Sequence, residues 1–357
     1  MYNKLDIKQK EAIAVKFDMF APNYGTLPSK YFEKSAITNP TELFWSDDLL
    51  SLMRLCGARE EQIGERASDY DRFLSICCAL SLLHGHPTRA WIASVFEKYF
   101  HLKELPTEET APIVWKNLCD TLLECPLSPK DIVSGDWLCE SLTIPSALPQ
   151  NITPTLNANL LLSTFAKSTA AWRDEIAATI AHFAANGCQK IVLHLPKEFS
   201  FVVPSVYHVD RTLQFAKRDR KATNLLICQL TRELCSILQE NGILLVLVCE
   251  NNAPSISNLL EYAENNVGLP RLCWSLRNAR DAYELLNFTA QPHKNEILAA
   301  LRYENVMTEG ELSTALMEWQ VRYPVARLCY LTTCDLRQAS FAEERICRML
   351  EKVSTKI

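Results

Sequence analysis

The feature that most constrains this chain is a regular alternation of helical and buried-strand patterns in its second half. A helical repeat of apolar residues at 172–186 ends in an Asn-Gly pair, and the apolar run 190–195 follows and is stopped by a proline. The same order recurs with a helix at 223–241 and a strand at 243–249. Strands that are apolar on both faces are typical of a parallel sheet covered by helices. The pattern therefore predicts an α/β fold whose chemistry lies just after the strand ends.

Extending the pattern along the whole chain predicts eight strands. They are expected at 13–20, 137–142, 154–162, 190–195, 243–249, 271–276, 297–303 and 327–333. Helices are expected at 172–186, 223–241, 255–266, 279–290, 310–320 and 340–353. The sequence has no glycine-rich phosphate turn, which a doubly wound sheet would more often show near its first strand. The pattern therefore favours a (β/α)8 barrel.

Between the first two expected strands the pattern changes to helices only. Caps and stops such as Asn39-Pro40 and Ser68-Asp69 mark about five helices in this region. We therefore expect an α/β architecture, a distorted (β/α)8 TIM barrel with an inserted all-helical lobe between strands 1 and 2. The barrel would comprise residues 1–29 and 134–357, and the lobe residues 30–133.

Composition excludes some classes of partner. The 357 residues carry a net charge of -5 with a pI near 5.9, which argues against a general electrostatic hold on nucleic acid or on an anionic membrane. The basic run Lys217–Lys221 is interpreted as a solvated loop before a helix. The longest apolar run, 243–249, is too short to cross a bilayer. We expect a soluble protein with no nucleic-acid or membrane partner. The sequence does not decide whether the protein forms a homo-oligomer.

The cysteines indicate a reducing compartment. The chain has 14 cysteines but no CxxC pair, and Cys139, Cys249 and Cys273 lie in apolar segments, as small buried hydrophobic residues do. The first residues show no signal-peptide pattern. Free thiols and a cytoplasmic location are therefore predicted.

A few polar residues stand where a barrel would display catalytic groups. His194 is either a base at the barrel mouth or a satisfied buried histidine, and Glu250 is either a catalytic group or a turn cap. Asp335 and Arg337 follow the eighth strand. They would serve as a base or metal ligand with a carboxylate clamp, or as a helix cap with a surface arginine. The histidine pair at 84–86 is interpreted as a loop at a helix end.

Three stretches carry a resemblance to a known family. They are FAPNYG at 20–25, IVLHLPKEFSF at 191–201 and CDLR at 334–337, and the segment 39–133 is similar to that family's inserted helices. On these residues the chain resembles the uronate isomerases of the amidohydrolase superfamily. The resemblance implies a distorted (β/α)8 barrel with a divalent metal such as zinc in its mouth. It also implies isomerisation of glucuronate or galacturonate to the keto-acid by proton transfer between C2 and C1.

The sequence departs from the family at most functional positions. The family's first strand ends in an HxH metal motif, for which this sequence has Lys16 and Asp18, and the third strand has Leu156–Ala158 where the family has an arginine and an aspartate. The family's functional residues at the end of the eighth strand are retained in this sequence. There Asp335 matches the metal-binding, proton-transferring aspartate, and Arg337 matches the substrate-binding arginine.

These matches, together with the polar residues at the strand ends, define the predicted site. Asp335 and His194 are the catalytic candidates, and the substrate-binding candidates are Arg337, Lys16, Tyr24 and Glu250. No cofactor or metal is expected at Lys16, Asp18 and Asp335, because a protonated lysine cannot coordinate a cation and one aspartate holds a divalent ion poorly. We expect Lys16, Asp18, Glu250, Asp335 and Arg337 to share one end of the barrel.

The absence of the metal pair leads to one further expectation about charge. A buried Asp335 needs a partner, and Lys16 would supply it from the neighbouring strand, leaving Arg337 free to bind a small carboxylate. In the alternative, Lys16 points to solvent and Asp335 only caps the final helix.

Two classes of function follow. The first is a divergent relative that has lost or strongly altered catalysis and keeps a sugar-acid-binding or scaffolding role. The second is an active uronate isomerase that interconverts an aldose uronic acid and its keto form with a rearranged, metal-free site. Isomerisation needs a positioned base and electrophilic help for the enediolate, of which the chain keeps about half. The first class is therefore favoured, with a sugar acid or other small carboxylate as ligand.

Overall fold

A closed run of parallel strands organises the fold. The computed structural model describes residues 23–146, 148–215, 218–239, 241–249, 253–276, 295–302, 328–331 and 333–354. Every pairing in its sheet is parallel, in the order β8-β7-β6-β5-β4-β3-β2-β1-β9. The strands are β1 (Tyr24–Thr26), β2 (Gly135–Leu138), β3 (Ile152–Asn157), β4 (Lys190–Leu195), β5 (Leu244–Cys249), β6 (Leu272–Leu276), β7 (Ile297–Arg302), β8 (Leu328–Leu331) and β9 (Thr333–Asp335).

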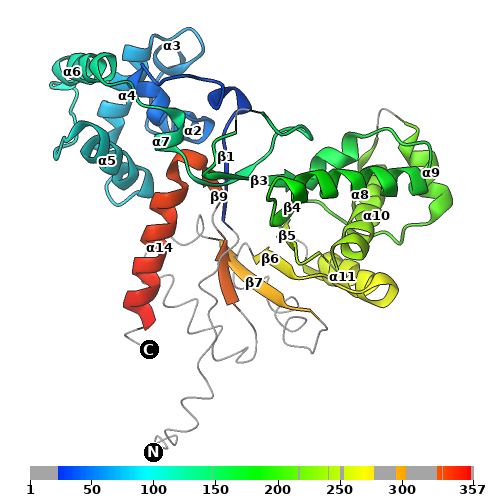
Figure 1. Cartoon of the computed structure of the whole chain (residues 1–357). Coiled ribbons are helices and arrows are strands. Elements are labelled where there is room, and N and C mark those ends of the chain that lie inside the picture. The colour runs from blue at the N-terminus through cyan, green and yellow to red at the C-terminus, as the bar shows by residue number, and fades with distance from the viewer. Residues whose placement is uncertain are drawn as a thin grey trace, which may run out of the picture.

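The two ends of this sheet belong to one strand. β8 pairs with β7 and β9 pairs with β1, and a single residue separates β8 from β9. The sheet therefore returns on itself through its eighth strand, and the predicted distorted (β/α)8 barrel is confirmed. Figure 1 shows the resulting curled sheet at the centre of the molecule.

Helices cover the outer side of the sheet. They are α8 (Thr169–Ala185), α9 (Val206–Leu213), α10 (Arg220–Leu238), α11 (Ala253–Val267) and α14 (Ala339–Ser354), and short 3₁₀ helices η3 (Ala158–Ser163) and η5 (Leu336–Gln338) follow β3 and β9. Gly187, with φ at +88°, ends α8 as predicted, because a glycine adopts the left-handed conformation without a steric cost. The expected helices at 279–290 and 310–320 lie outside the described residues. The short helix α9 was not predicted, although Val206, Val209 and Leu213 lie at helical spacing.

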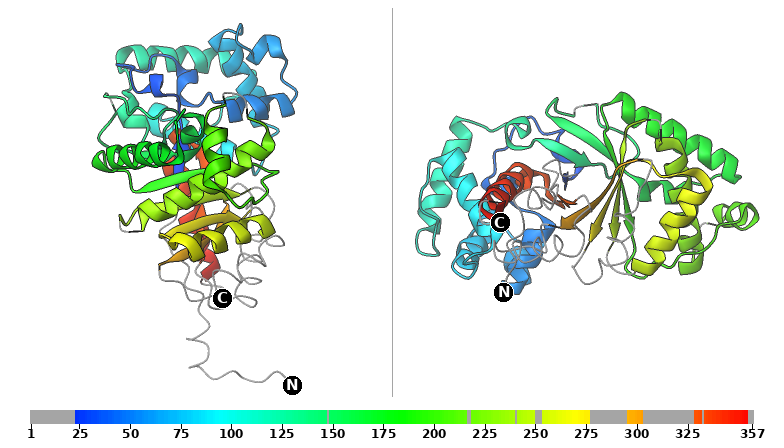
Figure 2. Two further views of the ribbon diagram at one scale, coloured as in Figure 1. Left: turned by 90° about the vertical axis from the view of Figure 1, so that its right-hand side faces the viewer. Right: turned by 90° about the horizontal axis from the view of Figure 1, so that it is seen from below.

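A group of helices separates β1 from β2. It comprises η1 (Ser29–Tyr31), η2 (Pro40–Leu43), α2 (Asp47–Leu55), α3 (Glu60–Ile63), α4 (Asp69–Leu80), α5 (Pro87–Phe100), α6 (Ala111–Glu124) and α7 (Pro129–Ile132). Figures 1 and 2 place this group, here called the lobe, beside α14 and on the other side of the sheet from α8, α10 and α11. The domain division at residues 29/30 and 133/134 stays a prediction.

The apolar residues form two clusters, one on each face of the sheet. The smaller cluster fills the barrel interior and includes Tyr24, Val192 and Val246. The larger cluster lies outside the barrel, includes Ile191 and Leu193, and continues into the lobe. Because side chains alternate along a strand, β4 is buried on both faces, which explains its continuous apolar sequence.

A charged pair lies at the amino end of the barrel interior. The Lys190 ammonium donates to the Asp136 carboxylate and, over 2.9 Å, to the carbonyl of Asn23. Lys190 and Asp136 alternate in phase with the interior residues Val192 and Leu138 on the same strands. The two opposite charges neutralise each other inside the barrel. The Lys190 contact with Asn23 also connects β4 to the residue that precedes β1.

The first strand corrects the sequence analysis. The expected strand at 13–20 lies outside the described residues, and the place between the second and eighth strands is held by β1, in which Thr26 pairs with Asp335. Tyr24 and Gly25, which lie beyond the end of the expected first strand, are therefore strand residues. Gly25 is needed because a Cβ there would lie 2.5 Å from the backbone Cα of Leu336.

We predict that Gly25→Ala destabilises the protein by about 1–3 kcal/mol, because the added methyl group must displace backbone of η5 rather than a flexible side chain. Chemical denaturation followed by circular dichroism would measure the change. An unchanged denaturation midpoint would show that β1 does not approach η5 this closely.

Candidate active site

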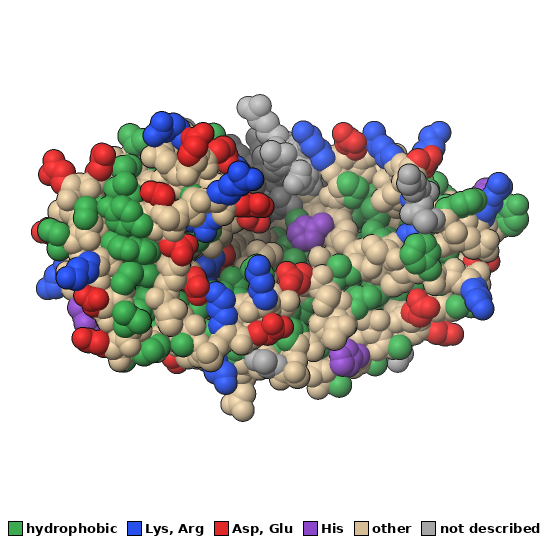
Figure 3. All heavy atoms as spheres, turned by 90° about the horizontal axis from the view of Figure 1, so that it is seen from above, with side chains coloured by type: hydrophobic (Ala, Val, Ile, Leu, Met, Phe, Trp, Pro, Cys, Tyr) green, Lys and Arg blue, Asp and Glu red, His purple; other side chains and the backbone are tan. Residues whose placement is uncertain are grey.

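A cavity of about 530 Å³ opens at the carboxyl ends of strands β1, β2, β3 and β9 and is called the mouth cavity here. Thr26, Leu138, Asn157 and Asp335 line it from the strands, and the segment 45–48 at the start of α2 lines it from the lobe. Seen from above, the molecule is hollowed between the lobe and the half that carries α8–α11 (Figure 3). Parallel barrels keep their reactive groups at this end, so the position agrees with that of an active site.

Asp335 and Arg337 form a closed ion pair in this cavity. The Arg337 Nε donates to Asp335 Oδ1 over 2.8 Å, and its Nη2 donates to Asp335 Oδ2 over 2.6 Å. Only 4% of the Arg337 side chain and 7% of the Asp335 side chain are exposed. This two-point geometry is the strongest arrangement available to a guanidinium and a carboxylate. Burial alone would lower the pKa of Arg337, but the hydrogen bond and charge of Asp335 raise this pKa above its ordinary value.

The same guanidinium also binds the lobe. Arg337 Nη1 donates to the carbonyl of Glu42 over 2.5 Å, and Nη2 donates to the carbonyl of Trp45 over 2.6 Å. Both carbonyls lie at the carboxyl end of η2, where a cation satisfies otherwise unpaired acceptors. The guanidinium carbon also lies 5.6 Å from the ring centroid of Tyr31. Burial raises the pKa of Tyr31 well above its ordinary value, so its ring faces Arg337 as a neutral phenol.

These contacts correct the prediction made for Arg337. We expected this side chain to be free for a ligand carboxylate, whereas its donors already serve Asp335 and two lobe carbonyls. Arg337 also supplies the positive charge that we had assigned to Lys16, which itself lies outside the described residues together with Asp18 and Glu250. Asp335 Oδ1 also accepts the backbone N–H of Arg337 and so caps the short helix η5 that precedes α14. Whether Lys16 pairs with Asp335 or points to solvent stays a prediction.

Further carboxylates line the mouth cavity. Glu140 accepts hydrogen bonds from the backbone N–H and the hydroxyl of Ser29 at 2.9 and 2.7 Å, and Asp47 and Asp48 lie at the start of α2. Burial raises the pKa of Asp48, and the carboxylates of Asp335 and Asp47 raise it further. An acidic lining repels a ligand carboxylate and favours hydroxyl groups that donate hydrogen bonds.

The described donors of the mouth cavity do not fit a catalytic divalent metal. Both carboxylate oxygens of Asp335 are held by Arg337, and the adjacent position on β1 is Thr26, a weak ligand. Within the described residues no cluster of three or more His, Cys, Asp or Glu side chains could hold a metal ion. A metal ion at Asp335 would also have to displace the buried Arg337 guanidinium. That the purified protein carries no metal stays a prediction.

A second cavity of about 450 Å³, here called the histidine cavity, lies by the end of β4. His194 Nε2 is 3.3 Å from the Tyr24 hydroxyl, with the two rings edge to face at 6.1 Å. The Asn159 side chain fixes the histidine backbone, since it accepts from the His194 N–H and donates to the His194 carbonyl, both over 2.8 Å. Lys197 and Thr223 line the same cavity.

The tyrosine–histidine pair combines two groups that can exchange a proton. Tyr24 projects from β1 and His194 from β4, so the two side chains meet across the barrel interior. Tyr24 is 2% exposed, whereas His194 is half-buried and is one of the residues that line the histidine cavity. The geometry is compatible both with a base at the mouth and with a buried histidine satisfied by a phenol.

The histidines at 84–86 take no part in either cavity. His86 is the N-cap of α5 and accepts the backbone N–H of Thr88, and His84 contacts Arg89. The loop interpretation of this pair is thus confirmed. None of the 14 cysteines forms a disulfide, as predicted.

Comparison with known proteins places the fold in the class of barrels that includes the uronate isomerases. The uronate isomerase structure from Thermotoga maritima matches 96% of this chain and 89% of that chain with a TM-score of 0.73 at 14% identity. The glucuronate isomerase structure from Caulobacter crescentus matches 96% of this chain and 86% of that chain with a TM-score of 0.69 at 12% identity. Both likenesses concern the fold alone.

Sequence similarity concentrates in the lobe. The family described as glucuronate isomerase matches residues 28–137. Over 108 residues the chain is 31% identical to the uronate isomerase of Caldicellulosiruptor saccharolyticus, and over 109 residues it is 31% identical to that of Streptococcus uberis. Each match covers 30% of this chain and 23% of the relative, so the chain matches about a quarter of their length.

Residues 28–137 are similar in sequence to the uronate isomerases and the chain is similar to them in fold, so the resemblance seen in the sequence is confirmed. The segment 39–133, on which the resemblance was partly based, lies within the matched residues, whereas 20–25, 191–201 and 334–337 lie outside them, so the residue roles carried over on these three stretches stay predictions. Among the described residues, no helix has both the length and the apolarity needed to cross a bilayer.

We predict that Arg337→Met lowers the free energy of unfolding by about 3 kcal/mol, because it leaves the Asp335 carboxylate buried without a partner. Adding Asp335→Asn should recover part of the loss, since the uncompensated charge is then removed. Urea denaturation of the single and double variants measures both values.

The matched control is Arg54→Met, which removes an exposed arginine whose Nε lies 2.6 Å from Glu60. This change should cost far less stability than Arg337→Met, because exposed ion pairs contribute little. Equal losses for Arg337→Met and Arg54→Met would contradict a structural role for the buried pair.

Proposed function

We propose that this chain is a uronate isomerase relative that has lost the isomerisation reaction and retains a sugar-acid-binding and scaffolding role. The closed pair of Asp335 and Arg337 carries the proposal. A proton-transferring aspartate must reach the substrate, and a substrate-binding arginine must offer free donors. In this chain the two residues satisfy each other and hold the lobe instead.

The histidine cavity suits a sugar acid better than the mouth cavity does. The mouth cavity exposes Asp47, Asp48 and Glu140, which oppose a ligand carboxylate. The histidine cavity instead offers Lys197 as a cation and the Thr223 hydroxyl as a hydrogen-bonding group. We therefore place the ligand carboxylate near Lys197.

The second candidate function is isomerisation with a rearranged, metal-free site. The observation that favours it is the 3.3 Å contact between Tyr24 and His194, two groups that can act as an acid–base couple in the barrel interior. In this case His194 would remove the C2 proton of the substrate, and the Tyr24 hydroxyl would donate a hydrogen bond to the C1 carbonyl oxygen.

The decisive experiment incubates the purified chain with glucuronate and with galacturonate, with and without added zinc or manganese, and follows the keto-acids by NMR. We expect no turnover above the protein-free rate. Turnover that disappears in His194→Ala would establish the rearranged isomerase instead. Turnover that requires metal and disappears in Asp335→Asn would show that the family reaction persists. Elemental analysis of the same preparation is expected to find no stoichiometric zinc, manganese or iron.

We further predict that glucuronate binding, measured by ligand-observed NMR, weakens about tenfold in Lys197→Gln, because a charge-assisted hydrogen bond is lost. Lys116→Gln, which changes an exposed lysine on α6 of the lobe, is the matched control and should bind as the parent chain does. If Lys197→Gln and Lys116→Gln bound glucuronate equally well, the proposal that the ligand lies in the histidine cavity would be wrong.

A further inference from the structure

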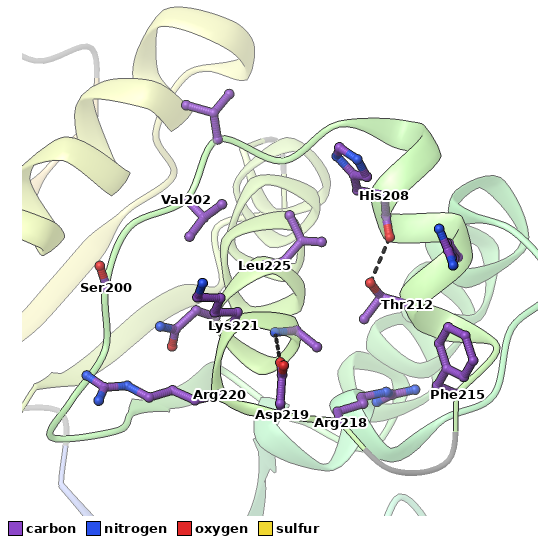
Figure 4. A pocket seen from close by; sticks show the side chains of 14 residues that line it. Ser200, Val202, His208, Thr212, Phe215, Arg218, Asp219, Arg220, Lys221 and Leu225 are labelled. Atoms are coloured by element: carbon purple, nitrogen blue, oxygen red, sulfur yellow. Dashed lines mark hydrogen bonds between the residues drawn. The ribbon is translucent and has the colours of Figure 1, made fainter.

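A third cavity, of about 850 Å³, lies between the loop after β4, helix α9 and the start of α10 and is called the α10 cavity here. It shares no lining residue with the mouth or histidine cavity. Figure 4 shows its apolar wall, with Val202 on the loop, Leu225 on α10 and Phe215 after α9. Phe215 is 53% exposed and Val203 is 63% exposed, so this wall offers uncovered apolar surface to a ligand.

The lining carries an excess of positive charge in a chain whose net charge is negative. Arg211, Arg218 and Lys221 line the cavity, and within the described residues none of them forms an ion pair. Arg218 instead donates to the carbonyls of Leu162 and Thr164. Burial of the guanidinium lowers the pKa of Arg218.

Two other charged residues at the cavity are already occupied. Arg220 pairs with Glu198, with 3.5 Å between the nearest charged atoms. Asp219 is the N-cap of α10, and its Oδ1 accepts the backbone N–H of Ala222 over 2.8 Å. The cavity therefore has three uncompensated cations, opposed only by this capping carboxylate.

The start of α10 adds unpaired backbone donors. This helix has 19 residues, and its N-cap side chain satisfies only the N–H of Ala222. The helix offers no internal acceptor to the first N–H groups, those of Arg220 and Lys221. Such donors, together with the helix dipole, favour an anion.

A buried amide independently indicates a ligand. Asn224 lines the cavity and the residue is only 4% exposed, and its side-chain amide forms no hydrogen bond with any part of the chain that the structure describes. A polar ligand in the cavity would supply the missing partner.

We propose that the α10 cavity is a binding site for a phosphate monoester. A phosphate dianion offers several acceptor oxygens to the helix start, to Lys221 and Arg211 and to the Asn224 amide. The cavity is much larger than inorganic phosphate needs, so the organic part of the ester lies against Val202, Leu225 and Phe215. This site is independent of the sugar-acid site proposed above.

Calorimetric titration of the full chain with phenyl phosphate, inorganic phosphate and benzyl alcohol tests the proposal. Phenyl phosphate should bind most tightly, inorganic phosphate more weakly, and benzyl alcohol should neither bind nor compete. Binding of phenyl phosphate should weaken with added sodium chloride, because the contact is between charges.

Variants locate the site. Lys221→Gln and Arg211→Gln change exposed residues, and each should weaken phenyl phosphate binding about tenfold through loss of a charge-assisted contact. Asn224→Leu should also weaken binding, and its thermal unfolding shows whether the fold is kept. Lys116→Gln is again the control and should leave binding unchanged. No binding of phenyl phosphate, or equal binding in Lys221→Gln, Arg211→Gln and the control, would overturn the proposal whether or not Asn224→Leu folds.

Discussion

The buried pair of Arg337 and Asp335 is the interaction on which the arrangement of barrel and lobe depends. Two ions removed from water are stable only when each meets a partner at close range and the remaining donors are satisfied. The guanidinium meets this condition by reaching Asp335 and the carbonyls of Glu42 and Trp45 at once. The strand that closes the barrel is thereby fixed to the lobe, and the mouth cavity takes its shape from that junction.

Most of the barrel could be predicted because its strands are buried on both faces. The run 190–195 was predicted with the bounds that the structure shows, since apolar residues on both faces give a continuous signal. The first strand was missed because Tyr24–Thr26 is only three residues long, contains a glycine and follows turn-forming residues. The apolar pattern at 13–20 is stronger, and for this reason the first strand was predicted there and not at Tyr24–Thr26.

The candidate site was predicted only in part. Asp335 and Arg337 could be singled out from their position after a strand, but their role depends on backbone carbonyls about 290 residues away, for which sequence carries no signal. The contact between Tyr24 and His194 likewise joins residues 170 positions apart. Local spacing predicts which residues reach the mouth, whereas tertiary contacts decide whether a side chain serves a ligand or the fold.

The most direct test of this account is NMR of the Arg337 guanidinium, assigned by comparison with Arg337→Lys. A two-point ion pair with two further carbonyl contacts hinders rotation about the Nε–Cζ bond, so we expect separate, slowly exchanging Nη resonances that do not shift when glucuronate is added. A single averaged resonance, or a shift that saturates with glucuronate, would contradict the account, because it would show that Arg337 is free to bind a ligand.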